Sequence, residues 1–394
     1  MQNADQKLSA TDKIGYGFGD FASNFFWQMF AIYMAKFYTD VYLLPAAAMG
    51  TMLAVTRIAD AFFDPLIGAV ADRTNTRFGH FRPYLVWMSL PLAAAAIAAL
   101  SVPGRGGSDH LAYAYVTLTA LMFFYSAINI PYSALLGVLT PSTQERNSVS
   151  AYRFVMAFLP IFIITGCTDP MVQYFGETNA VARGWQMSMV VYALIATFVF
   201  LLCFLKTRER VQPPPRQNTS LLRDLKDLRG NRPWVVLCIV SIAALTYGNI
   251  RNTVLVYYFD YVVPSGHGVF QYAMWIGAGC FVLGVMASAP LARWLGKKKF
   301  YLWSMAVTAV LTVAFYFVPP NHLSLVLEMH ALICLASAPT APLVWSMYAD
   351  TADYSEWRQG RRATGLVFSA ASFAQKLGWA LGGAGAGWLL AYFG

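Results

Sequence analysis

The stretch from Thr56 to Arg77, TRIADAFFDPLIGAVADRTNTR, decides how the rest of the chain has to be interpreted. Its apolar part, up to Ala71, belongs to a membrane span, yet this part carries two carboxylates, Asp60 and Asp64. One carboxylate at the centre of a bilayer costs about 2.5 to 3.5 kcal/mol, so two cost roughly 5 to 7 kcal/mol. A chain accepts this cost mainly where the acids face a cavity and have a role there.

The spacing of the two acids indicates what that role is. Residues at i and i+4 lie on one face of a helix with Cβ atoms about 6 Å apart, so both carboxylates ionise comfortably only with a cation between them. This layout favours a cation site. Arg57 lies three residues before Asp60 on the same face, which leaves open an internal ion pair that neutralises itself, although one arginine cannot balance two carboxylates.

The composition predicts an all-α polytopic membrane protein. Of 394 residues, 58% are hydrophobic and only 12% are charged, which excludes an ordinary soluble globular protein. The net charge of +9 does not indicate a nucleic-acid partner, because the basic residues fall in short loops at the ends of apolar runs. The lipid bilayer is therefore the expected environment.

Eleven apolar runs are long enough to cross about 30 Å of hydrocarbon. Most basic loop residues fall on one side, which predicts a multi-pass protein of the inner (plasma) membrane with a cytoplasmic N-terminus. The expected spans are Lys13 to Thr39, Ala46 to Ala71, Pro83 to Pro103, Leu111 to Leu139, Val149 to Cys167, Met187 to Leu205, Pro233 to Val263, Val269 to Leu291, Phe300 to Val318, Leu323 to Tyr348 and Ala363 to Phe393.

The sequence suggests neither an enzyme nor a bound cofactor. The five cysteines show no CxxC or Cys/His ligand spacing, and they are expected to be thiols within helices. A membrane-embedded enzyme would need a nucleophile with its base, or a metal cluster, and we find no such pattern. The N-terminus, Met1 to Asp12, lacks the regions of a cleavable signal, so the first span is expected to remain in the protein.

The longest polar connection divides the chain after six spans. It is rich in charge and contains three consecutive prolines, and it predicts a first half at residues 1–206, a cytoplasmic linker at 207–232 and a second half at 233–394. A basic, turn-forming loop follows span two at Ala71 to Gly79, and a degenerate copy follows span eight at Ala292 to Lys299. The two halves are therefore expected to be related.

A basic loop at both of these positions resembles the major facilitator superfamily. The resemblance implies two pseudo-symmetric halves of six helices with a midplane site at their interface. Such a fold has twelve spans, whereas eleven are visible before the chain stops at Gly394. We therefore expect the twelfth helix to be missing and the natural protein to continue through another span.

Four stretches sharpen the resemblance to the glycoside-pentoside-hexuronide:cation symporter family, to which the melibiose carrier belongs. They are spread over the whole chain in the order found in that family: Tyr16-Gly17-Phe18-Gly19-Asp20, Arg57-Ile58-Ala59-Asp60 with Asp64-Pro65, Asn129-Ile130-Pro131-Tyr132, and Asp350 to Arg362 (DTADYSEWRQGRR) leading to Gln375-Lys376.

The resemblance assigns the coupling cation to Asp60 and Asp64, in agreement with their spacing. It also places a hydroxyl ligand at Ser126, although this side chain could instead bond back to its own helix. The melibiose carrier has an amide just before the second acid, where this chain has Phe63. Because hard cations need several oxygens and a proton needs only a carboxylate, the coupling ion is left as H⁺ or Na⁺.

The resemblance also implies a set of sugar ligands. The melibiose carrier uses acids on spans one and four, and the matching residues here are Asn24 and Asn129. An amide can still hydrogen-bond a sugar hydroxyl, but the bond is not charge-assisted. This favours a different ligand, such as a pentoside or an acidic sugar. Arg153 matches an arginine that contacts sugar, with a membrane-edge anchor as the alternative. Asp20, one turn before Asn24, is expected on the same polar face.

Lys376 lies inside the last span, where an amine is costly, so it is expected to face the cavity or to pair with a carboxylate. The resemblance places a lysine here near the cation site, which implies roles for Lys376 in substrate binding and, with Arg57, in coupling. The expected function is symport of a sugar or glycoside with a monovalent cation by alternating access. The rivals are a carrier of lysolipids or other amphiphiles and, further away, a membrane-embedded enzyme.

Overall fold

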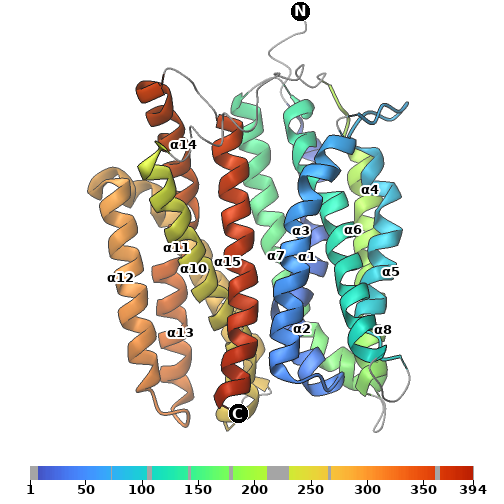
Figure 1. The fold of residues 1–394 in the computed structure, drawn as a ribbon, viewed down its shortest axis with the longest axis vertical. Coiled ribbons are helices and arrows are strands. Elements are labelled where there is room, and N and C mark those ends of the chain that lie inside the picture. Colours follow the sequence, from blue (N-terminus) through green and yellow to red (C-terminus); the bar gives the residue numbers. More distant parts are fainter. Residues whose placement is uncertain are drawn as a thin grey trace, which may run out of the picture. The chain divides into compact units, whose positions relative to one another are not determined.

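In a computed structural model of the protein, the regular structure is helical wherever the chain is described (Figure 1). The described residues are 8–71, 73–103, 109–140, 143–176, 181–210, 230–264, 268–359 and 364–393. Within them, eight helices are long and apolar enough to cross a membrane. The protein is therefore an all-α polytopic membrane protein, as the composition predicted.

The contacts divide the chain into two compact units. Unit 1 comprises Met1–Pro215 and Gly383–Gly394, and unit 2 comprises Arg216–Gly382. The helices that begin in the first part of unit 1 are α1 (Ala10–Gln28), η1 (Met29–Tyr33), α2 (Met34–Lys36), η2 (Phe37–Val41), α3 (Ala46–Ala71), α4 (Pro83–Trp87), α5 (Ser89–Ala99), α6 (Asp109–Leu139), α7 (Thr143–Gly176) and α8 (Val181–Lys206).

The remaining helices begin in unit 2, and their bounds agree with the predicted spans to within a few residues, except that the span expected at Leu323 to Tyr348 is broken and continues to Gln359. They are α10 (Arg232–Tyr257), η3 (Tyr258–Val262), α11 (Phe270–Leu295), α12 (Lys297–Tyr316), α13 (Leu323–Ser337), α14 (Thr340–Gln359) and α15 (Thr364–Phe393). A continuous helix was expected from Leu323 to Tyr348, but α13 ends at Ser337 and α14 begins at Thr340. The break contains Pro339, which has no N–H to donate to the helical hydrogen-bond ladder.

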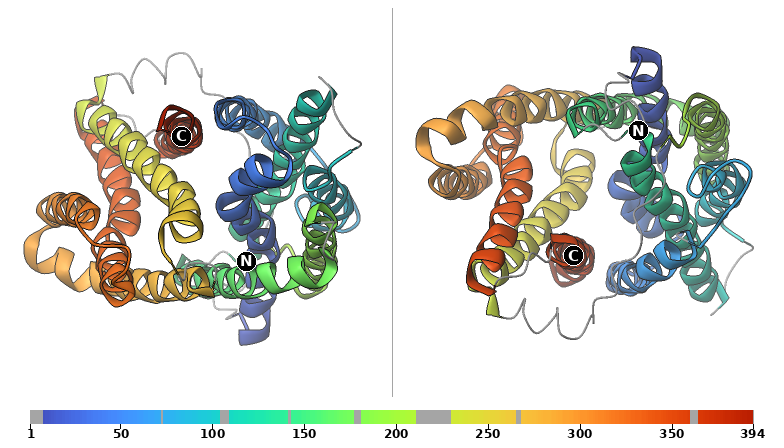
Figure 2. Two further views of the ribbon diagram at one scale, coloured as in Figure 1. Left: turned by 90° about the horizontal axis from the view of Figure 1, so that it is seen from below. Right: turned by 90° about the horizontal axis from the view of Figure 1, so that it is seen from above.

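In unit 1, α1 packs against α7 and α8, and the end-on views show these three helices side by side (Figure 2). Small residues permit this approach. A Cβ atom added to Gly17 would come within 2.8 Å of the Met156 side chain on α7, and one added to Gly15 within 2.4 Å of Lys206 at the end of α8. Glycine therefore sets the distance between these helices.

The contact between α1 and α6 is made by two stacked tyrosines. The rings of Tyr16 and Tyr132 lie 4.6 Å apart, and each hydroxyl donates to the other residue's carbonyl, at 3.0 and 2.8 Å. Both side chains are fully buried, so the reciprocal bonds satisfy hydroxyls that have no access to water. This pair fixes the helix that carries Asp20.

A carboxylate holds the end of α8 against the loop between α3 and α4. Glu209 accepts hydrogen bonds from the backbone N–H groups of His80, Phe81 and Arg82, at 2.9, 2.7 and 3.1 Å. The approach requires the left-handed backbone of Gly79, whose φ is +112°. Thr207 to Arg210, the first residues of the expected linker, thus contact unit 1, whereas residues 211–229 lie outside the described part of the chain.

We expect Gly19→Ala to destabilise the protein, because the added Cβ would lie 2.2 Å from the buried Tyr132 ring. Overpacking of this kind costs about 1 to 3 kcal/mol. Gly137→Ala on α6 is the matched control, since a Cβ there meets nothing within 4 Å, and it should be neutral or stabilising by up to about 1 kcal/mol. Thermal unfolding in detergent measures both. Equal melting temperatures for the two variants would contradict the packing described.

Candidate functional site

The carboxylate of Asp60 lies inside unit 1, on α3, and is 2% exposed. The Ser126 hydroxyl on the neighbouring α6 donates a 2.6 Å hydrogen bond to its Oδ1 atom. The hydroxyl thus bonds to the acid rather than back to α6, and its role as a cation ligand stays a prediction. A hydroxyl that donates to a carboxylate forms a short and strong hydrogen bond.

Asp64 follows one turn later on α3 and is half-buried. The residue before it, Phe63, packs edge-on against Phe123 of α6, with ring centroids 5.2 Å apart. An aromatic contact therefore fills the position at which the melibiose carrier has an amide. The oxygen donors identified here are the two carboxylates and the Ser126 hydroxyl, and among the described residues no group of three or more His, Cys, Asp or Glu could hold a metal ion.

Arg57 is buried on α3, and its guanidinium carbon lies over two rings of α1 and η1, 4.6 Å from the Trp27 centroid and 4.2 Å from that of Phe30. These are cation–π contacts. Among the described residues its Nη2 atom has no hydrogen-bond partner. Both the aromatic rings and the charge of Asp60 therefore act on this arginine.

The second polar cluster of unit 1 links α1, α6 and α7. Asp20 is 6% exposed and accepts from the Nε–H of Arg153 and, at 3.2 Å, from the hydroxyl of Tyr132. The Arg153 guanidinium also lies over the Tyr132 ring, 5.2 Å from its centroid. Arg153 therefore turns inward to an acid, which disfavours the alternative of a membrane-edge anchor.

The two asparagines expected to bind sugar are partly committed to their own helices. Nδ2 of Asn24 donates to the Asp20 carbonyl at 2.9 Å, and Nδ2 of Asn129 donates to the Tyr125 carbonyl at 3.0 Å. Each amide keeps an oxygen and a second N–H that can bond to a ligand. Asn24 lies one turn after Asp20 on α1, and Asn129 lies one turn after Ser126 on α6, so each extends one of the two polar clusters.

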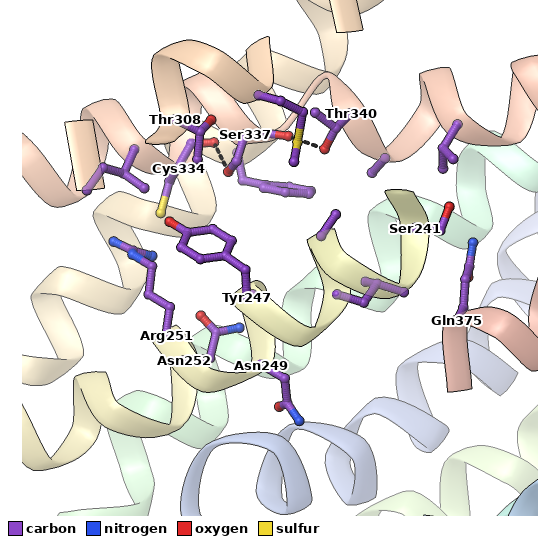
Figure 3. Close-up of a pocket in the computed structure, with 18 of the residues that line it drawn as sticks. Ser241, Tyr247, Asn249, Arg251, Asn252, Thr308, Cys334, Ser337, Thr340 and Gln375 are labelled. Atoms are coloured by element: carbon purple, nitrogen blue, oxygen red, sulfur yellow. Dashed lines mark hydrogen bonds between the residues drawn. The ribbon is translucent and has the colours of Figure 1, made fainter. Parts of the chain in front are cut away.

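Unit 2 contains a cavity of about 430 Å³, within the range of small-molecule sites (Figure 3). Its wall is mostly apolar, and the polar or aromatic side chains that line it include Tyr247, Asn249, Arg251, Asn252, Trp345, Gln375 and Trp379. Lys376, which lies next to Gln375 on α15, is half-buried and is not part of this lining.

Sequence reasoning missed Arg251. Lys376 was treated as the charged residue that matters in the second half, although Arg251 lies well inside α10, in Gly248-Asn249-Ile250-Arg251-Asn252. The signal was available, because an ionisable residue within a span is costly wherever it occurs. What the sequence alone does not give is the cavity beside it.

The motif from Asp350 to Arg362 is only partly described. Asp350, in the middle of α14, forms a 2.7 Å ion pair with Lys297 at the start of α12. Both side chains are exposed. The side chains of Asp353, Ser355, Glu356 and Arg358, and residues 360–363 altogether, lie outside the described part. The contribution of this motif to a site stays a prediction.

Apolar helices that carry polar clusters and a small-molecule cavity in their interior define a membrane transporter. The family described as MFS/sugar transport protein matches residues 15–394, so the chain belongs to that family. It is a family of transporters and not of enzymes.

The chain is similar along nearly its whole length to curated transporters. It is 34% identical over 386 residues to the putative glycoside/cation symporter YagG of Escherichia coli, covering 98% of this chain and 84% of that protein. It is 32% identical over 389 residues to the isoprimeverose transporter of Lactiplantibacillus pentosus, covering 96% and 80%. The crystal structure of the nucleoside transporter NupG has the same fold, with a TM-score of 0.70, 13% identity and 97% and 92% coverage.

We expect Asp20 and Arg153 to depend on each other. Removing one member of a buried ion pair leaves an uncompensated charge, whereas removing both does not. Asp20→Asn and Arg153→Gln should each lower the melting temperature in detergent by more than the double substitution does. If the two single effects simply add in the double variant, the pair is not coupled and the arrangement at α1 and α7 is wrong.

Proposed function

We propose that the protein is a symporter that carries a glycoside, pentoside or hexuronide together with H⁺ or Na⁺ by alternating access. The observation that carries the proposal is the Asp60 carboxylate, buried in an apolar helix and bonded to Ser126. The names of two relatives support it, since one is a glycoside/cation symporter and another an isoprimeverose transporter. The net positive charge in the loops supports a cytoplasmic N-terminus.

The cation is proposed to bind at Asp60 and Asp64, with the Ser126 oxygen as a further ligand. Ser126 already donates to Asp60, so its lone pairs are free to face a bound ion. A proton needs only one of the carboxylates, whereas Na⁺ would need more oxygens than these side chains supply, for instance from water or sugar hydroxyls. Either ion relieves the repulsion between two acids on one helix face.

The sugar is proposed to bind beside the second cluster. The Asp20 carboxylate and the unused N–H groups of Arg153 can accept from and donate to hydroxyls, and the amides of Asn24 and Asn129 can do both. Because Asp20 is held by Arg153 and Tyr132, its position is fixed before the sugar arrives. Such preorganisation lowers the entropic cost of binding.

Lys376 and Arg57 are proposed to couple ion and sugar binding. Both are cations within apolar helices, where a charge is costly unless it has a role, and a change in their interactions when the ion binds would link the two binding events. Lys376→Val should therefore damage transport while the protein still folds. Normal uptake with normal ion dependence in this variant would exclude Lys376 from coupling.

We expect Asp64→Asn, and also Asp60→Asn, to abolish uphill sugar accumulation while sugar still binds. A tenfold ion gradient supplies about 1.4 kcal/mol, enough for tenfold accumulation, but only if the ion is bound during transport. The proposed sugar ligands lie on other helices, so equilibrium binding should change little. Uptake into vesicles under an imposed H⁺ or Na⁺ gradient, paired with sugar binding to purified protein, measures both effects.

Asp12→Asn is the matched control, because Asp12 lies in the first turn of α1 and pairs with Arg210 outside the proposed site. It should leave accumulation unchanged. Ion-dependent accumulation that survives in both Asp60→Asn and Asp64→Asn would mean that this pair is not the cation site. Binding of a lysolipid, with no binding across a panel of glycosides, would instead favour the amphiphile carrier.

A further inference from the structure

Arg251 is an arginine of unit 2 whose hydrogen-bonding partners are neutral. Its Nη2 atom lies 2.8 Å from Nδ1 of His330 on α13. Since arginine only donates, Nδ1 must accept, which places the imidazole proton on Nε2, 3.6 Å from the Cys334 sulfur. A neutral imidazole orients the guanidinium without balancing its charge.

Arg251 differs from Arg153 of unit 1 in that its contact is with a histidine and not with an acid. Arg153 is paired with the Asp20 carboxylate, whereas no carboxylate of the described residues lies within ion-pair distance of Arg251. His330 is 3% exposed and is packed so tightly that a Cβ added to Gly277 would lie 2.5 Å from its Nε2. The imidazole is therefore fixed in place as a hydrogen-bond acceptor for the guanidinium.

The guanidinium lines the cavity of unit 2 (Figure 3). Arg251, Tyr247 and Cys334 lie at one end of the cavity, and Gln375 lies at the other. The amides of Asn252 and Gln375 have no hydrogen-bond partner among the described residues. Trp345 and Trp379 add aromatic surface to the wall. The cavity thus combines one fixed cation, neutral hydroxyl-binding groups and aromatic rings.

We propose that this cavity binds the carboxylate of a sugar acid at Arg251, so that the transported sugar is a hexuronide or a related acidic sugar. The guanidinium contacts His330 and the Cys334 sulfur, and its remaining N–H groups can form the bidentate contact with a carboxylate that arginine favours. The bound carboxylate supplies the counter-charge that the cavity wall lacks, and the amides receive ring hydroxyls. The inference rests on the proposed sugar transport, and it concerns the carboxylate of the sugar, whereas the contacts proposed above for unit 1 are with sugar hydroxyls.

A purely structural role of Arg251 is the competing explanation, since its bond to His330 also ties α10 to α13. The two roles differ in selectivity. A structural contact affects every substrate alike, whereas an anion subsite affects only ligands that carry the carboxylate. Matched sugars that differ at one carbon therefore separate the two explanations.

The experiment measures equilibrium binding of methyl glucuronide and methyl glucoside, each as both anomers, to the purified full chain. We expect the wild type to prefer a glucuronide. Arg251→Gln should weaken glucuronide binding by about tenfold to a hundredfold and glucoside binding by less than about threefold, because only the former loses a charge-assisted contact. Arg251→Lys keeps the positive charge but cannot form the bidentate contact, so its glucuronide affinity should lie between those of the wild type and Arg251→Gln.

Arg293→Gln is the matched control, since Arg293 is an exposed arginine in the last turn of α11. It should bind both sugars as the wild type does. Equal losses of both sugars in Arg251→Gln, or a wild type that binds glucosides but not glucuronides, would overturn the inference and leave the proposed symport standing. If the wild type neither binds nor transports any sugar of a wider neutral and acidic panel, the proposed function fails, and the inference fails with it.

Discussion

A buried carboxylate in an apolar helix is the constraint on which the site in unit 1 depends. Asp60 has almost no contact with solvent, and its identified neutral partner is the Ser126 hydroxyl at 2.6 Å. An ionised carboxylate in such surroundings is stabilised by hydrogen bonds or by a cation. The proposed ion-binding role rests on this local chemistry of α3 and α6, and the family assignment supplies the context of sugar transport.

The remaining structure of unit 1 supplies rigidity for this chemistry. Glycines on α1 allow close packing against its neighbours. The Tyr16–Tyr132 pair fixes α1, which carries Asp20, against α6, which carries Ser126. Unit 2 differs, because its cavity carries Arg251 with a neutral histidine rather than an acid. A sugar carboxylate at Arg251 and one cation at Asp60 and Asp64 would cross the membrane with no net charge, so the concentration gradient of the ion would supply the driving force.

Much of this could be predicted from the sequence, because the determinants are local. The bounds of α3 agree with the expected span, and the i, i+4 spacing of Asp60 and Asp64 can be seen in the sequence. Ser126 was placed beside these acids only by the family resemblance. Contacts between distant segments could not be predicted. The aromatic rings over Arg57, the Asp20–Arg153 pair and the histidine beside Arg251 each join helices far apart in the chain. The break at Pro339 was missed because apolar composition continues across it.

The most direct test of the account is sugar accumulation in proteoliposomes clamped at zero membrane potential. With the wild-type protein, a tenfold inward gradient of H⁺ or of Na⁺ should raise the internal concentration of a transported sugar about tenfold above the external one, for one ion carried per sugar. Collapsing the ion gradient with an ionophore should return the ratio to one. A sugar that equilibrates but never accumulates under either gradient would contradict cation-coupled symport.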